Sequence, residues 1–135
     1  MTTEEIGALV MKAKAEGHSV FALTISGIKY IYRSINRAEF RELQAVLTKE
    51  AEDLRQEADN RKKGLSKDDP KLAEIDMYVE KQAAIIRERG EERLVEKSLI
   101  HPKLTPGTPA GVSPTLADRT MEASGYGGDE QPEML

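Results

Sequence analysis

Few residues of the types that perform catalysis or bind metals occur in this chain. It contains two histidines, His18 and His101, and no cysteine, which excludes disulfides, thiolate zinc sites and a Cys nucleophile. Neither histidine has a serine or carboxylate at a recognisable catalytic spacing, and we expect both at the surface or at helix ends. The glycines form no phosphate-binding motif. The sequence therefore predicts that the protein is not an enzyme and has no metal site and no cofactor.

Charged residues make up 33% of the 135-residue chain and follow the pattern of solvated helix faces. Acidic and basic side chains alternate at three- and four-residue spacings, which is typical of exposed ion pairs. The net charge of −4 argues against a general binder of nucleic-acid phosphates. No run approaches the roughly 20 apolar residues of a membrane span, and the acidic start does not resemble a signal peptide. We expect a cytoplasmic protein with no nucleic-acid partner and no membrane partner.

The length allows one domain, and the low aromatic content of 4% favours a thin, helical core. The first segment, Thr3 to Glu16, has helical apolar spacing and ends at Gly17. Two β-forming segments, Val20 to Ile25 and Ile28 to Arg33, flank Ser26-Gly27 and predict a hairpin. Its apolar face needs a helix or more strands over it, and we expect the first helix or the helix after Asn36 to cover it. The hairpin's two edges stay open, so self-association is possible.

The turn length fixes the register of this hairpin. A two-residue turn places apolar residues opposite one another on one face, namely Ile25 with Ile28, Leu23 with Tyr30 and Phe21 with Tyr32. The other face then carries two mixed pairs, Thr24 with Lys29 and Ala22 with Ile31.

Two long helices follow the hairpin. Asn36-Arg37-Ala-Glu39 is a capping box, and the helix that it starts runs to about Lys63-Gly64. After a polar connector, with Asp68 or Asp69 as cap, a second helix runs to about His101-Pro102. Both carry a narrow apolar stripe, which resembles a coiled-coil seam. The stripes comprise Phe40, Leu43, Leu47, Ala51, Leu54 and Ala58, and then Leu72, Ile75, Val79 (or Tyr78), Ala83, Ile86, Gly90 and Leu94.

These segments predict a mainly α protein with a small β-hairpin (α+β class), built around a long antiparallel helical hairpin. We place its body at residues 1–101. Four of the six prolines fall within residues 102–114, which predicts a Pro/Gly linker. Residues 115–126 predict a short helix, capped by Ser113 or Thr115 and ended by Gly125. Residues 127–135 are expected to be a disordered tail.

Two phrases resemble a known family. Tyr30-Ile-Tyr32-Arg33-Ser-Ile-Asn36-Arg37-Ala-Glu39-Phe40 resembles the aromatic-x-aromatic-Arg-x-Leu-Ser/Thr-Arg-x-Glu-aromatic pattern of the small tail assembly chaperones of tailed bacteriophages. The C-terminal phrase, from Leu94 through Pro102 and Pro109-Ala-Gly-Val to Met121-Glu-Ala-Ser-Gly-Tyr126, is similar to the closing segment of that group. Some relatives are described as baseplate hub assembly proteins. The resemblance covers residues 20–43 and 94–126, and Asn36 replaces the usual Ser or Thr.

The resemblance implies a non-enzymatic protein of the host cytoplasm. Such a protein binds a phage tape measure or baseplate hub protein and keeps it soluble during tail assembly. A narrow apolar seam is compatible with this role, because it can cover a partner's amphipathic helix. Hypothetical partner-binding residues are Leu47, Leu54, Val79, Ile86, Leu116, Met121 and Tyr126, although the seam residues also suit packing of the two helices on each other. We expect Arg33, Arg37 and Glu39 to join the hairpin to the helix.

Two other functions fit the same sequence. A permanent structural adaptor of the virion baseplate or tail would use an open strand edge and the Pro-rich segment to dock onto neighbours. A small regulator of host nucleic-acid metabolism would need a salt-sensitive interaction with DNA or RNA, and the acidic balance makes this the weakest of the three. The presence of the chain in mature particles distinguishes an adaptor from a chaperone.

Overall fold

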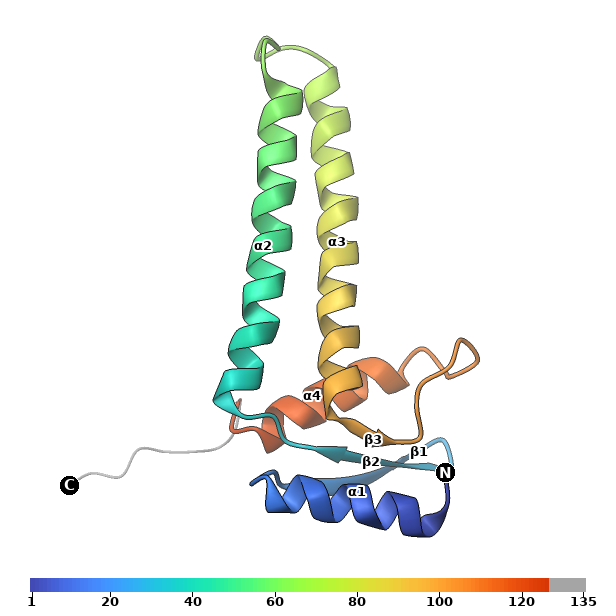
Figure 1. The fold of residues 1–135 in the computed structure, drawn as a ribbon. Helices are drawn as coiled ribbons and strands as arrows, with labels where there is room; N and C mark the ends of the chain where they lie inside the picture. Colours follow the sequence, from blue (N-terminus) through green and yellow to red (C-terminus); the bar gives the residue numbers. More distant parts are fainter. Residues whose placement is uncertain (127–135) are drawn as a thin grey trace, which may run out of the picture.

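The structure, a computed structural model, describes residues 1–126, so the expected disorder of residues 127–135 lies outside the described part. Its fold is mainly α with a small antiparallel sheet, as predicted (Figure 1). The helices and strands run in the order α1 (Thr3–Ala15), β1 (Val20–Ile25), β2 (Ile28–Arg33), α2 (Arg37–Lys62), α3 (Lys71–Ser98), β3 (Leu99–His101) and α4 (Val112–Ala123).

The β1–β2 hairpin has the predicted register. Ile25 pairs with Ile28, Leu23 with Tyr30 and Phe21 with Tyr32. Ser26 and Gly27 both adopt positive φ angles, of 51° and 81°. This is the backbone of a type I′ turn, whose twist matches that of the flanking strands.

A third strand forms where the sequence predicted helix. The expectation that the second long helix reaches His101 is wrong, because α3 ends at Ser98 and Leu99 is extended. Leu99–His101 then pairs antiparallel with β2. The free edge of β2 offers hydrogen bonds to this segment, whereas the following Pro102 cannot continue a helix. The sheet order is β1-β2-β3, so β2 is central and only one of the two edges predicted to be open, that of β1, remains a full-length edge.

Neither helix expected to cover the apolar face of the hairpin does so. The end of α3 and α4 cover it, and α1 lies on the opposite side of the sheet (Figure 1). The buried cluster joins β2 to these two helices and comprises Tyr30, Tyr32, Val95, Val112, Leu116 and Ala117. Leu23 and Ile25 of β1 are partly buried against it. The core therefore assembles from chain segments that are more than sixty positions apart.

The predicted antiparallel helical hairpin is present and projects from the rest of the molecule (Figure 1). At 1.5 Å per residue, the 26 residues of α2 span about 39 Å. We call residues 44–93 the stalk, and residues 1–43 with 94–126 the base. Asn36 and Glu39 form the predicted capping box. The N-cap of α3 is Pro70 and not the predicted Asp68 or Asp69, although the Asp69 side chain accepts a hydrogen bond from the Lys71 amide at 2.9 Å.

The last helix begins earlier than predicted. It starts at Val112, and neither Ser113 nor Thr115 caps it, because Gly111 is the N-cap without a side-chain hydrogen bond. Thr115 instead donates its hydroxyl back to the Gly111 carbonyl at 2.7 Å. The helix ends as predicted with Gly125 at a φ of 92°. Hydrogen bonds from Gly125 to Glu122 and from Tyr126 to Met121 complete a Schellman motif.

Candidate partner-binding surface

A groove lies at the root of the stalk, where α2, α3 and α4 meet. Its volume is about 310 Å³. Its apolar lining is contributed by Phe40, Leu43, Leu47, Leu94, Ala117 and Met121. Arg87, Glu91 and Asp118 give it a rim of mixed charge. We call this hollow the root groove. An apolar floor with a charged rim suits the apolar side of an amphipathic helix.

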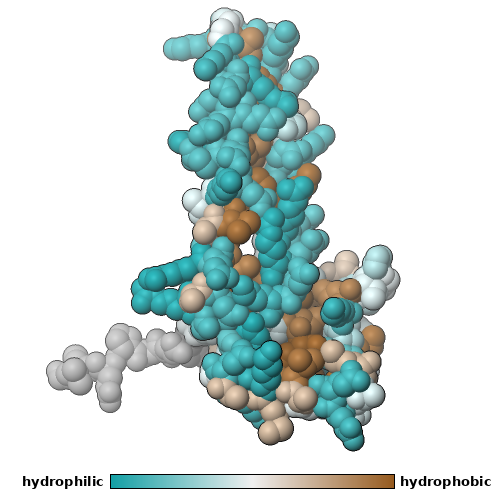
Figure 2. All heavy atoms as spheres, in the orientation of Figure 1, coloured by the Kyte–Doolittle hydropathy of each residue, from teal (hydrophilic) through white to brown (hydrophobic). Residues whose placement is uncertain are grey.

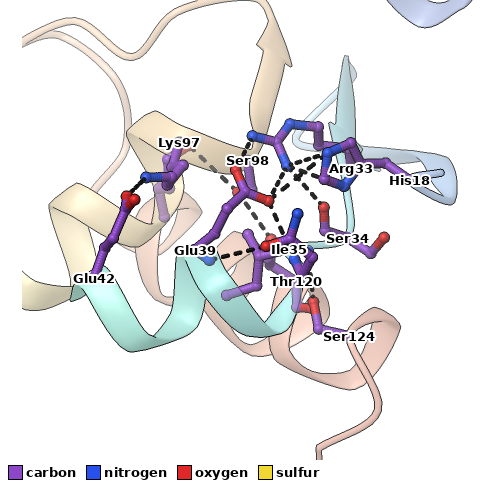
Figure 3. Close-up of polar contacts among 12 residues, drawn as sticks. His18, Arg33, Ser34, Ile35, Glu39, Glu42, Lys97, Ser98, Thr120 and Ser124 are labelled. Atoms are coloured by element: carbon purple, nitrogen blue, oxygen red, sulfur yellow. Dashed lines mark hydrogen bonds and ion pairs between the residues drawn. The ribbon is translucent and has the colours of Figure 1, made fainter. Parts of the chain in front are cut away.

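Helix α4 forms one wall of the root groove and is held by contacts that include two hydrogen bonds and one aromatic contact. Ser124 accepts a hydrogen bond from the Ile35 amide at 2.9 Å, which ties the end of α4 to the segment between β2 and α2 (Figure 3). Thr120 donates to the buried Ser98 at 3.0 Å. The Schellman motif turns the chain back, and the Tyr126 ring packs on Phe40 with 4.8 Å between centroids. The wall is therefore fixed at both α2 and α3.

Arg33 joins the sheet to the start of α2. Its guanidinium donates two hydrogen bonds to the Glu39 carboxylate, at 2.9 and 2.7 Å (Figure 3). The same group donates to the Ser34 carbonyl and lies 3.2 to 3.3 Å from the ring nitrogens of His18. The hydrogen bonds from Arg33 lower the pKa of the Glu39 carboxyl against the opposing effect of burial. The predicted joining role of Arg33 and Glu39 agrees with this geometry, whereas Arg37 is exposed.

His18 is buried, so the predicted surface position is wrong, whereas the alternative prediction of a helix end is confirmed, because His18 lies in the turn that ends α1. Only 9% of the residue is exposed. A second Schellman motif, with Gly17 at a φ of 92° and a bond from the His18 amide to Ala13, turns the chain inward after α1. His101 is half-buried in β3.

The stalk is charged outside and apolar between its helices. Figure 2 shows hydrophobic atoms in the interval between the two helices, framed by hydrophilic side chains. The seam departs from its predicted path at one position, because Ala51 is exposed and Glu50 is half-buried. The Glu50 carboxylate forms ion pairs with Arg93 and Arg89 of α3. Tyr78 is also half-buried, and its hydroxyl donates to Glu57 at 3.0 Å, which raises the Tyr78 pKa.

The seven residues predicted to bind a partner have different surroundings. Leu116 is completely buried in the core, so its predicted role as a contact residue is corrected to a structural one. Met121 and Leu47 line the root groove. Tyr126 is 40% exposed beside Phe40. Leu54, Val79 and Ile86 are half-buried along the stalk.

Sequence reasoning missed a second hollow, of about 550 Å³, between α3 and the Pro-rich segment. Glu88, Glu91 and Glu92 line its helix side, and Leu104, Pro106 and Pro109 are among the residues on the other. Ser113 donates to Glu91 at 3.3 Å across it. The sequence signal for this hollow was the spacing of the acidic residues on α3, but the same spacing is typical of a solvated helix face.

Two kinds of feature are absent from the described residues. No helix within residues 1–126 is both long enough and apolar enough to cross a membrane. The same residues contain no group of three His, Asp or Glu side chains placed to share a metal ion.

No protein family model, no curated protein and no solved structure matches this chain. The resemblance to tail assembly chaperones therefore depends on two sequence phrases alone. The structure adds one observation about these phrases. They fold together, since Tyr30 and Tyr32 of the first contact Val95, Val112 and Leu116 of the second in one core.

Proposed function

We propose that this chain is a non-enzymatic tail assembly chaperone of a tailed bacteriophage. In the host cytoplasm it binds a tape measure or baseplate hub protein and keeps it soluble until the tail assembles. The observation that carries the proposal is that the two sequence phrases that resemble the family pack together in the base. The root groove lies beside them, at the foot of the projecting stalk. Residues remote in sequence that jointly build one unit support a shared origin for the two phrases.

The root groove gives the proposed binding a physical basis. Tape measure and hub segments that form amphipathic helices would place apolar side chains on Leu43, Leu47 and Met121. Arg87, Glu91 and Asp118 supply both signs of charge at the rim, so the partner helix can pair its own Lys and Glu residues there. Covering the partner's apolar side in this way prevents its aggregation.

Location during infection separates the chaperone from a virion adaptor. We would capture the tagged chain from infected cells, analyse purified particles by mass spectrometry, and score both samples for tape measure and hub proteins. A chaperone is captured with such a protein in the lysate and is absent from particles. A fixed copy number in particles would instead establish the structural adaptor.

A matched pair of substitutions tests the root groove. Met121→Glu places a charge in the apolar lining, and we expect the amount of co-expressed partner kept soluble to fall at least about tenfold, as for a central contact residue. Met77→Glu makes the same change at a 60% exposed stalk position and should leave solubilisation unchanged. Circular dichroism melting of both variants confirms that they fold. Equal solubilisation by the two folded variants would exclude the root groove as the binding surface.

A further inference from the structure

The two edges of the small sheet differ in a way that points to self-association. Strand β3 has three residues, an irregular register against β2 and a proline directly after it. These are devices that protect a sheet edge from pairing. Strand β1 has six residues in regular register, without charge, proline or bulge. Within the described residues, β1 is a terminal strand with no third-strand neighbour.

The backbone of β1 is ready to accept another strand. Because Ile25 and Ile28 flank a two-residue turn, they form a hydrogen-bonded pair, and such pairs alternate along the hairpin. Phe21, Leu23 and Ile25 thus bond to β2. Val20, Ala22 and Thr24 direct their amides and carbonyls away from it, and Ala22 and Thr24 are exposed.

We propose that two copies of this chain pair through β1, antiparallel about a two-fold axis at Ala22, into a continuous six-stranded sheet. This register joins Ala22 to its own copy and Val20 to Thr24 of the second copy, so all three outward-directed residues gain partners. The chaperone proposal is not needed for this inference.

The side chains of β1 favour a second copy as the occupant. The axis places Phe21 opposite Leu23 of the other copy, on the sheet face that carries the core. Phe21 is 41% exposed although it stacks on Tyr32, so its free surface would be covered. No charged residue occurs in β1, so no like-charge pair opposes the contact. The resulting sheet ends on both sides in the protected β3, which leaves no unprotected edge.

The contact is small. Six strand residues on each side are far fewer than the roughly 20 to 30 per partner of a standard interface, and we expect a dissociation constant of about micromolar order. We would therefore measure molar mass of the full chain by sedimentation velocity from low-micromolar to sub-millimolar concentration. The proposal predicts a rise from monomer to dimer. A monomer at every concentration would overturn it.

Two substitutions identify the surface. Ala22→Pro removes only an outward-directed amide, and Thr24→Lys adds a charge at the edge, so both should abolish the dimer and retain the monomer's circular dichroism. Thr48→Lys makes the same replacement at an exposed α2 position and should retain the dimer. A dimer that persists in Thr24→Lys would place the interface elsewhere, whether or not Ala22→Pro folds.

A cysteine test fixes the register, because the natural chain has none. Paired antiparallel residues have Cα atoms about 5.5 Å apart, which is within the range for a disulfide. Oxidation should link Ala22→Cys into a covalent dimer. Thr24→Cys is the control, since its two copies would lie four positions apart along the strands. Equal linking of both variants would contradict the proposed axis. Binding of an extended peptide to a monomeric chain would show that the edge serves another partner, which also overturns the proposal.

Discussion

Arg33 connects three parts of the chain through one guanidinium. It belongs to β2, it donates to Glu39 at the start of α2, and it contacts His18 after α1. Both charged side chains of the pair are mostly covered, with 17% and 15% exposure. An ion pair with two parallel hydrogen bonds fixes direction as well as distance. Arg33 therefore holds the start of α2 against the end of β2.

Replacing Glu39 with Gln should lower the free energy of unfolding by about 1 to 3 kcal/mol near neutral pH. Glutamine at this position still completes a capping box, so the change removes the ion pair selectively. The pKa of Glu39 is lower in the folded than in the unfolded state, so on acidification the unfolded chain binds the proton first. The stabilisation is present above the ordinary pKa and is lost as pH falls through the folded pKa.

Denaturant unfolding at a series of pH values between neutral and about 3 measures this difference. The difference in the free energy of unfolding between the natural chain and Glu39→Gln should become smaller as the pH falls. Glu52→Gln is the control, because Glu52 pairs with Arg55 at the surface, where such a pair contributes at most about 1 kcal/mol. A difference independent of pH would mean that the Arg33–Glu39 charge pair is not the source of the stabilisation.

At the scale of elements, α2 and α3 face each other at a glycine of α3. Gly90 lies within α3 opposite Leu47, and a Cβ at this position would meet the Leu47 side chain at 3.7 Å, an ordinary contact distance. Glycine in a helix interior has a larger entropy cost on folding than alanine. The contact itself therefore does not require glycine.

Gly90→Ala should raise the free energy of unfolding by about 0.5 to 1 kcal/mol. Gly125→Ala should lower it, because Gly125 adopts a φ of 92° in the turn that brings Tyr126 to Phe40. Thermal melting of the two variants compares an alanine whose backbone conformation is favourable, at position 90, with one that is strained, at position 125. A destabilised Gly90→Ala would show that the helices approach more closely there than this contact indicates.

The elements that could be predicted are those whose signals are local. The capping box at Asn36, the turn at Ser26-Gly27 and the period of the stripes each depend on a few adjacent residues. The first two predictions are confirmed, and the stripes are confirmed except at Ala51, which is exposed. Strand β3 could not be predicted, because its three residues become a strand only where the edge of β2 is available. The burial of His18 and Leu116 likewise depends on segments far away in the chain.

At the scale of the whole molecule, the core is concentrated in the base. The buried cluster lies between the sheet, the end of α3 and α4. Along the described stalk, the buried apolar residues are Ala58 and Ile75, and the other seam residues are only partly covered. Two helices in contact bury one stripe each, whereas the base packs helices on both faces of a sheet (Figure 1). The stalk must therefore be the less stable part.

Hydrogen exchange of backbone amides should reveal this gradient. Amides of residues 55–80 should exchange orders of magnitude faster than those of Tyr30, Tyr32 and residues 116–120, because local opening of the stalk exposes little apolar surface. Short helices are marginal in water without packing, so the far ends of α2 and α3 should open together from the connector inward. If a partner helix occupies the root groove, exchange should slow first at residues 43–47 and 87–94, nearest the contact. Uniform protection along the chain would instead mean that stalk and base unfold as one cooperative unit, and that the half-buried seam stabilises the stalk as strongly as the core stabilises the base.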